Sequence, residues 1–270
     1  DLVWDSPWGK GRPGWHIECS AMSMDALGET FDIHAGGAEL KFPHHENEIA
    51  QSEAITKNHF ASYWLHTGPL KIDQEKMSKS LDNFLTIRDA LKKYPYEILR
   101  FFLLSSHYRS PINFSEDDLE ESKSALERLY TAVLGLDTSK VEVLSTTSHT
   151  DAFRKAMDDD FNVPEAFAIL FNLAKAINIE KEKGEEKKAQ SLAKELTTLS
   201  EPLGLLQQDP EIFLKSGVEI EESEIDSLIK KREEARANGD YTVADSIRNQ
   251  LFKDNIILED SKEGTFWRRR

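Results

Sequence analysis

The chain has 270 residues, of which 39% are hydrophobic and 31% are charged, and its formal net charge is −15 at pH 7. This composition allows two or three domains with substantial cores and excludes wholesale disorder. The single cysteine excludes an internal disulfide and is typical of a reducing compartment, so we expect a cytoplasmic protein. The densest apolar run, 98–104, falls far short of the ~20 residues that span a bilayer, so no membrane partner is expected. At first sight the negative charge also argues against a nucleic-acid partner.

The distribution of charge weakens that last argument. Residues 51–110 carry 9 basic and 6 acidic side chains, whereas residues 111–221 carry 12 basic and 23 acidic ones. The acid is therefore concentrated in the middle of the chain, and one earlier segment is locally basic. The net charge of the whole chain is a poor guide to its partners.

Residues 1–70 are rich in Gly, Pro, His and Trp and alternate between strand and helix signals. Short apolar runs at 15–17 and 30–33 predict strands, and Gly28 predicts the end of a short helix. A helix is predicted over 44–56, directly after Pro43. This alternation indicates part of an α/β sheet domain.

From residue 86 the pattern becomes helical. Thr86 and Asp89 resemble a capping box, and Ser115 is placed to cap a long helix that runs to residue 134. Apolar residues at helical spacing then predict a helix bundle. The remaining predicted helices cover 96–106, 151–158, 163–183, 187–203, 223–237 and 241–252. Residues 204–222 are interpreted as a linker, and 256–259 with 265–268 as a β-hairpin.

A possible metal site lies in the first 50 residues. Cys19 is the sole thiol, and His44 and Glu48 are four residues apart, so they share one face of a helix. A thiolate, an imidazole and a carboxylate are all zinc ligands, although a fourth ligand is not evident. The alternative is a small buried cysteine and a histidine that merely lies at a helix end.

A second chemical signal is the pentapeptide Lys-Met-Ser-Lys-Ser at 76–80. Lys76 and Lys79 stand three residues apart among small hydroxyl residues, within the locally basic segment. Such ammonium groups can stabilise negative charge that develops on a polyphosphate during group transfer. The alternative for two lysines at this spacing is a solvated charged loop.

Together these segments resemble the cysteinyl-tRNA synthetase family of class I aminoacyl-tRNA synthetases. Residues 76–80 match the complete KMSKS signature of that class. Residues 11–22, which contain Cys19, resemble the family's zinc-cysteine segment, and 32–37 with 42–48 resemble the segment that follows it. Residues 157–162 resemble the entry to the family's helical bundle, and 264–268 its tRNA-binding tail.

The resemblance implies roles for individual residues. Cys19, His44 and Glu48 match three of four zinc ligands. The amino-acid pocket is expected to include Trp15, His34 and His44, and the ATP site Gly36, Gly37 and Lys79. Lys76 and Lys79 are the candidate catalytic lysines, and Trp267 and Arg268 the candidate tRNA-binding residues.

The resemblance also implies the architecture. The expected order is the second part of a class I Rossmann catalytic domain (α/β), an all-α helical bundle, and a small α+β C-terminal domain. The corresponding ranges are 1–70 for the Rossmann part with the zinc site, 71–112 for the KMSKS loop and connecting helices, 113–205 for the bundle, and 222–270 for the anticodon-binding domain.

The implied activity is cysteine-tRNA ligation. Cysteine would react with ATP and Mg²⁺ to give cysteinyl-adenylate, and the cysteinyl group would then pass to tRNA-Cys. One zinc ion per chain would recognise the substrate thiol, and a monomer is expected.

Part of the family pattern is missing. We find neither the His-Ile-Gly-His signature that binds ATP phosphates nor a second zinc cysteine, so we expect the chain to be the C-terminal part of such an enzyme. Two alternatives stay open: a non-catalytic tRNA-binding fragment, and a related cysteine ligase whose acceptor is a small-molecule amine. The tail-like residues 222–270 argue against the second.

Overall fold

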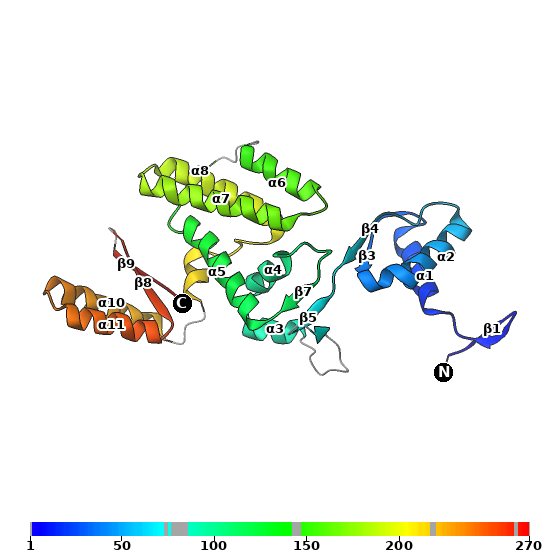
Figure 1. The fold of residues 1–270 in the computed structure, drawn as a ribbon, viewed down its shortest axis with the longest axis horizontal. Coiled ribbons are helices and arrows are strands. Elements are labelled where there is room, and N and C mark those ends of the chain that lie inside the picture. The colour runs from blue at the N-terminus through cyan, green and yellow to red at the C-terminus, as the bar shows by residue number, and fades with distance from the viewer. Residues whose placement is uncertain are drawn as a thin grey trace. The chain divides into compact units, whose positions relative to one another are not determined.

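The computed structural model describes residues 2–72, 75–76, 86–141, 147–216, 220–261 and 264–269. They form two compact units (Figure 1). Unit 1 consists of Asp1–Glu120 with Asp158–Pro164, and unit 2 of Glu121–Met157 with Glu165–Arg270. Within the described residues, no helix has both the length and the apolar character needed to cross a bilayer.

The first part of unit 1 contains a β-α-β arrangement, which carries the candidate metal ligands together with helix α1. Strands β3 and β4 pair in parallel, with Phe31 opposite Ala61 and Gly37 opposite Thr67 (Figure 1). Helix α2 connects the two strands, and α1 packs against α2. The elements of this part are β1 (Trp4–Ser6), β2 (Gly9–Gly11), α1 (Trp15–Leu27), β3 (Phe31–Gly37), α2 (Glu46–Thr56) and β4 (Ala61–Thr67), with a 3-10 turn at Ala38–Leu40 and a π turn at Lys41–His45.

The prediction of a strand at 15–17 is wrong, because these residues form the first turn of α1. The apolar run is only three residues long and is the start of the thirteen-residue helix α1, which packs against α2. The predicted helix end is confirmed. Gly28 adopts a φ of 93°, which favours glycine, and its N–H bonds to the carbonyl of Met24 at 3.1 Å.

The second part of unit 1 is a small three-stranded sheet with two helices. Its strand order is β6-β5-β7, with β5 antiparallel to β6 and parallel to β7. Thr86 caps α3 as predicted, because its side chain accepts a hydrogen bond from the Asp89 N–H at 3.1 Å. The elements are β5 (Leu70–Ile72), β6 (Glu75–Lys76), α3 (Ile87–Lys93), α4 (Tyr96–Leu104) and β7 (Ile112–Phe114).

Helices supply most of unit 2, and they lie close to the predicted ranges. They are α5 (Glu116–Val133), α6 (Ser148–Asp158), α7 (Val163–Glu182), α8 (Glu186–Ser200) and α9 (Pro210–Lys215), with a 3-10 turn at Glu201–Leu203. Leu170 and Leu196 are fully buried, as the helical spacing of apolar residues requires. Helix α9 lies inside the predicted linker, so that part of the prediction is wrong. Packing explains why α9 forms. Its Phe213 stacks on the Tyr130 ring of α5, with 4.0 Å between the ring centroids.

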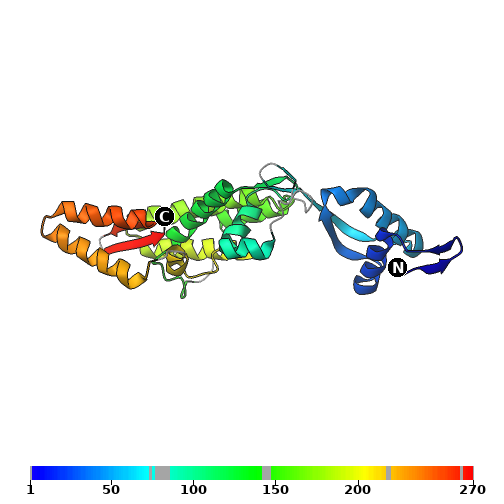
Figure 2. The same cartoon turned by 90° about the horizontal axis from the view of Figure 1, so that it is seen from below.

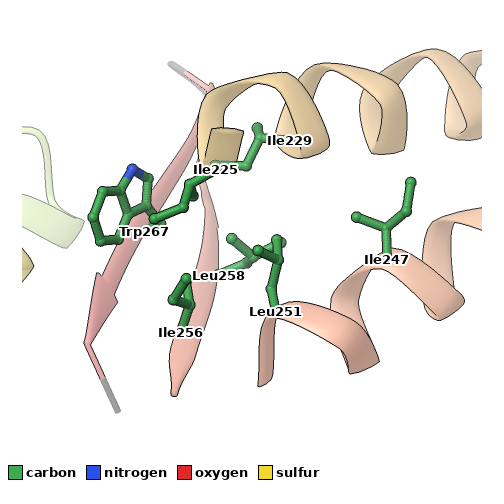
Figure 3. Packing of buried hydrophobic residues seen from close by; sticks show 7 residues of the cluster. All are labelled: Ile225, Ile229, Ile247, Leu251, Ile256, Leu258 and Trp267. Atoms are coloured by element: carbon green, nitrogen blue, oxygen red, sulfur yellow. The ribbon is translucent and has the colours of Figure 1, made fainter. Parts of the chain in front are cut away.

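The C-terminal part of unit 2 is a helical hairpin followed by a β-hairpin, as predicted. Helices α10 (Glu222–Ala237) and α11 (Tyr241–Lys253) run side by side in Figures 1 and 2. Strands β8 (Ile256–Ser261) and β9 (Gly264–Arg269) are antiparallel, with Leu258 opposite Trp267. Figure 3 shows the core that joins helices and strands, which consists of Ile225, Ile229, Ile247, Leu251, Ile256, Leu258 and Trp267.

Candidate metal and substrate site

Three elements of unit 1 bring a thiol, an imidazole and a carboxylate together. Cys19 comes from α1, His44 from the π turn before α2, and Glu48 from the first turn of α2. One ligand atom of each lies within 4.8 Å of the other two. The predicted ligand residues therefore converge on one point, where the two packed helices approach each other.

The carboxylate at the centre of the site is deeply buried. Glu48 is 1% exposed, and its Oε1 lies 2.5 Å from His44 Nε2. Its Oε2 lies 2.8 Å from His34 Nε2 but makes no hydrogen bond of acceptable geometry with the described residues. Burying a charged oxygen without a full set of partners is unfavourable, so this position favours an additional positive group.

A neighbouring histidine orients the His44 ring. The Nδ1 atom of His44 lies 2.7 Å from His16 Nδ1, which leaves Nε2 directed at Glu48. Ligating histidines commonly use one ring nitrogen for the metal and the other for such an orienting contact. The site thus has the outer support that metal sites need.

The Cys19 thiol stays protonated in this environment. Burial raises its pKa, and the nearby carboxylate of Glu48 raises it further. A divalent cation between the two groups would reverse both effects, because it stabilises the thiolate and neutralises the carboxylate. Sulfur, nitrogen and oxygen donors in one small site fit zinc.

A second cluster of histidines adjoins the first. His34, His45 and Glu48 also have ligand atoms within 4.8 Å of one another, and His45 Nδ1 lies 2.9 Å from His66 Nε2. Burial lowers the pKa of His45 to about 4, helped by the charges of His34, His66 and His44. Burial likewise lowers the pKa of His66. The imidazoles of His45 and His66 are therefore neutral near pH 7 and can accept as well as donate hydrogen bonds.

Sequence reasoning did not single out His16, His45 or His66. One signal was available, because six of the eight histidines lie within residues 1–66. Spacing alone could not find them, since they reach the site from α1, the π turn and β4.

Trp15 lies beside this cluster, as its expected place in an amino-acid pocket requires. Its ring centroid is 5.1 Å from that of His44, and the residue is 65% exposed. An exposed indole next to the candidate ligands can cover a small molecule bound there. Its predicted role in substrate binding stays a prediction.

The two glycines at the end of β3 lie in close contact with neighbouring side chains. A Cβ on Gly36 would lie 2.8 Å from the His45 ring, and one on Gly37 would lie 2.6 Å from the Glu39 carboxylate. The glycines therefore make room for side chains of the histidine cluster and the following turn. Whether ATP also approaches there is a separate prediction.

The lysine pentapeptide lies mostly outside the described residues. The backbone of Lys76 belongs to β6, opposite Lys71 of β5. Lys79, and the rest of 77–80, fall outside the described part of the chain.

Trp267, one of the two candidate tRNA-binding residues, lies in a core and not on the surface. The residue is only 3% exposed and belongs to the core in Figure 3. Arg268 is also engaged, because its Nε donates to Glu259 at 2.7 Å and its Nη1 lies 3.8 Å from Glu127. Strand alternation sends Trp267 inward, and Arg268 is paired with two carboxylates; a role of either residue in tRNA binding stays a prediction.

Three families of known domains match consecutive parts of this chain. The "tRNA synthetases class I (C) catalytic domain" matches residues 1–124, the "DALR domain" matches 152–207, and the "Cysteinyl-tRNA ligase anticodon binding domain" matches 222–268. Together they cover the metal site, the helices of unit 2 and the C-terminal hairpins.

Curated relatives match almost the whole chain. The cysteine-tRNA ligases of Halorhodospira halophila and Haemophilus influenzae are each 54% identical over 268 residues, which is 99% of this chain. That of Actinobacillus pleuropneumoniae is 55% identical over 98% of this chain. In each case this chain spans 58% of the relative's length.

The fold has a counterpart among solved structures. The LeuRS of Agrobacterium radiobacter, in a ternary complex with tRNA and LeuAMS, aligns with 78% of this chain and 33% of its own, with a TM-score of 0.58 and 17% identity. This similarity shows a class I aminoacyl-tRNA synthetase-like fold with mixed α/β and helical content. With the three matching domain families and relatives above 50% identity, the chain belongs to the cysteinyl-tRNA synthetase family.

Proposed function

We propose that this chain is the portion of a cysteine-tRNA ligase that recognises the thiol of cysteine and engages tRNA-Cys. The protein would join cysteine to ATP, giving cysteinyl-adenylate and pyrophosphate, and then transfer the cysteinyl group to tRNA-Cys. The observation that carries the proposal is the convergence of Cys19, His44 and Glu48 on one point. Relatives 54% identical to the chain are named for this activity.

Cys19, His44 and Glu48 would hold a zinc ion. Once bound, zinc would supply a coordination position that takes a thiolate far better than the hydroxyl of serine. An apolar pocket separates such small groups by only ~1–3 kcal/mol, so a direct ligand is the better filter. Trp15 would close the pocket over the substrate, and His34 would line it together with the neutral His45.

The sheet of unit 1 supports a larger catalytic domain. β3 and β4 form a two-stranded parallel sheet on which Ile33 is 54% and Tyr63 68% exposed. Parallel sheets are normally covered on both faces. We therefore infer that further strands and helices of a Rossmann domain cover this sheet, supplied by the 42% of the relatives' length that this chain does not span.

Lys76 and Lys79 would bind the phosphates of ATP, with Mg²⁺ as the usual companion ion, and Gly36 and Gly37 would let the nucleotide approach the backbone. Residues 1–70, 71–112, 113–205 and 222–270 would act as the Rossmann part, the KMSKS loop with its connecting helices, the bundle and the anticodon-binding domain. The protein is expected to work in the cytoplasm as a monomer.

The test is cysteine-dependent exchange between ATP and pyrophosphate. The chain would be joined to the segment of the Haemophilus influenzae relative that it does not span, and exchange measured with cysteine, serine and alanine. We expect exchange with cysteine alone, a loss with Cys19→Ser, and a lower turnover but retained cysteine binding with Lys79→Ala. Absence of exchange in the joined protein, with tight binding of tRNA-Cys, would instead favour a non-catalytic tRNA-binding role.

A further inference from the structure

One charged cluster of unit 1 lies outside the metal site and is not used by the proposed chemistry. The carboxylate of Asp160 accepts hydrogen bonds from the Tyr108 hydroxyl at 2.7 Å and from Arg109 through Nε at 2.5 Å and Nη2 at 3.0 Å. Both oxygens are therefore engaged by a guanidinium fork, the strongest arrangement for such a pair. The His107 ring stacks beside Tyr108, and its Nε2 lies 3.9 Å from the same carboxylate.

The backbone around Asp160 is in an unusual conformation. Asp160 has a φ of 54° and Phe161 a φ of 55°, which side chains with a Cβ rarely adopt. Such residues persist where the surrounding contacts determine them. The Arg109 fork and the edge contact between the Phe161 and Tyr108 rings, at 6.4 Å between centroids, are those contacts.

The turn held by Asp160 supports the start of β5. The carbonyl of Tyr108 accepts the Gly68 N–H at 2.8 Å, and the Ile112 N–H donates to Pro69 at 3.1 Å. The two segments are so close that a Cβ on Gly68 would lie 2.1 Å from the Ser110 carbonyl oxygen. The turn and the segment that leads into β5 are therefore joined by backbone hydrogen bonds and a close backbone contact.

The same turn also leads directly into β7, which pairs with β5 in parallel, and β5 pairs in turn with β6. Strand β6 ends at Lys76, the first residue of the lysine pentapeptide. A continuous series of hydrogen bonds thus runs from the Asp160 carboxylate to the strand pair that introduces the candidate phosphate-binding lysines.

We propose that Asp160 is a positioning residue: through Arg109 and Tyr108 it fixes the turn 107–110 and so holds β5 and β6 in the register that presents Lys76 to ATP. The inference rests on the proposed function for its chemical consequence, although its structural part is independent of it. Among the described residues, Asp160 contacts Tyr108, Arg109 and His107 and none of the candidate metal ligands. Consistent with a constantly charged anchor, the Arg109 and Tyr108 hydrogen bonds lower the pKa of Asp160 to about 2.

The test compares Asp160→Asn with Asp158→Asn in the joined protein described above. Asp158 is an exposed carboxylate on the same segment and makes no ion pair with the described residues, so it controls for the loss of one negative charge. Arg109→Lys is a second variant, because it keeps the positive charge but cannot form the fork.

The first readout is amide hydrogen exchange at Gly68 and Ile112. We expect amide hydrogen exchange to be about tenfold faster in Asp160→Asn, because one charge-assisted hydrogen bond is lost. In Asp158→Asn the exchange rate should equal that of the wild type. Arg109→Lys should lie between them. Unchanged exchange at Gly68 in Asp160→Asn would overturn the proposal, whatever the activity.

The second readout is ATP–pyrophosphate exchange kinetics with zinc content as a check on folding. The kcat should fall about tenfold in Asp160→Asn, while the KM for cysteine and the zinc content stay at the wild-type level. Faster amide hydrogen exchange at Gly68 with an unchanged kcat would show that Asp160 stabilises the turn but has no role in the reaction. If the wild-type joined protein itself lacks ATP–pyrophosphate exchange, the proposed function fails, and the chemical part of this inference fails with it.

Discussion

Replacement of Trp267 by alanine tests whether this residue is part of the core. Its indole is 3% exposed and packs with Ile225, Leu258 and four other apolar residues. Truncation of a buried Trp costs about 3–5 kcal/mol. The ring also faces the Lys215 ammonium, which lies 5.0 Å from its centroid, and this contact contributes a further ~0.5–1 kcal/mol.

One effect opposes this loss. The indole Nε1 is buried without a hydrogen-bond partner among the described residues, so its removal relieves a penalty of about 1–2 kcal/mol. The net destabilisation is then about 3 kcal/mol. A segment as short as 222–268 has a total stability of about 5 kcal/mol at ~0.1 kcal/mol per residue, so most of it is lost.

The assay is urea unfolding followed by the methyl NMR signals of Ile225 and Ile247. With a slope of about 1 kcal/mol per molar urea, the midpoint for Trp267→Ala should fall by ~3 M. Tyr241→Ala is the matched control, because this aromatic residue of α11 is 66% exposed and should change stability by less than about 0.5 kcal/mol. Equal midpoints for Trp267→Ala and the wild type would refute the assignment of Trp267 to the core.

Three further predictions concern contacts of unit 1 and unit 2. Gly68→Ala should strongly destabilise unit 1, because the new Cβ would lie 2.1 Å from the Ser110 carbonyl oxygen; an unchanged melting temperature would contradict the close approach. The pKa of Asp160 is lowered to about 2, so its contribution to stability is complete above pH ~4 and is lost as the pH falls toward 2. The urea midpoints of the wild type and Asp160→Asn should therefore converge in this range, and a constant difference between them would contradict the ion pair. Glu127→Gln should weaken the attachment of the half-buried Arg269, whose Nη2 lies 3.3 Å from Glu127 Oε1, and should speed amide hydrogen exchange along β9; wild-type protection of β9 would show that the pair contributes little.

Local signals predicted much of the secondary structure. Thr86 and Ser115 were identified as helix caps from the local sequence, and each hydroxyl accepts a hydrogen bond from the backbone N–H three residues later. Gly28 ends α1 for the reason that its sequence position suggested. Such features are determined by residues close in the sequence, and they can therefore be predicted from the sequence alone.

The incorrect predictions concern segments whose structure depends on contacts with residues far away in the sequence. Helix α9 carries both Asp209 as its cap and Pro210 at its first position, yet six residues form no stable helix alone; Phe213 must first pack on Tyr130. For the β-hairpin, the alternation of residues does not say which face meets the helices. Trp267 therefore could not be assigned to the core before its partners were known.

The candidate metal site divides in the same way. The i, i+4 spacing of His44 and Glu48 is local, and Cys19 was a candidate because it is the sole thiol and because the family resemblance implied the same role. His16, which orients His44, and His66, which contacts His45, come from other elements and were not predicted. Their contribution follows from the packing of α1 on α2 and from the β3–β4 pair.

The central claim is that Cys19, His44 and Glu48 hold a zinc ion, and zinc content tests it most directly. The chain would be loaded with zinc, dialysed and analysed for metal, with Cys19→Ser and the exposed α1 variant Met22→Ser measured in parallel. We predict about one zinc per chain in the wild type and in Met22→Ser, and a large loss of zinc in Cys19→Ser while its helical circular dichroism is retained. Equal zinc content in the wild type and Cys19→Ser, or no zinc in any of the three proteins, would contradict it.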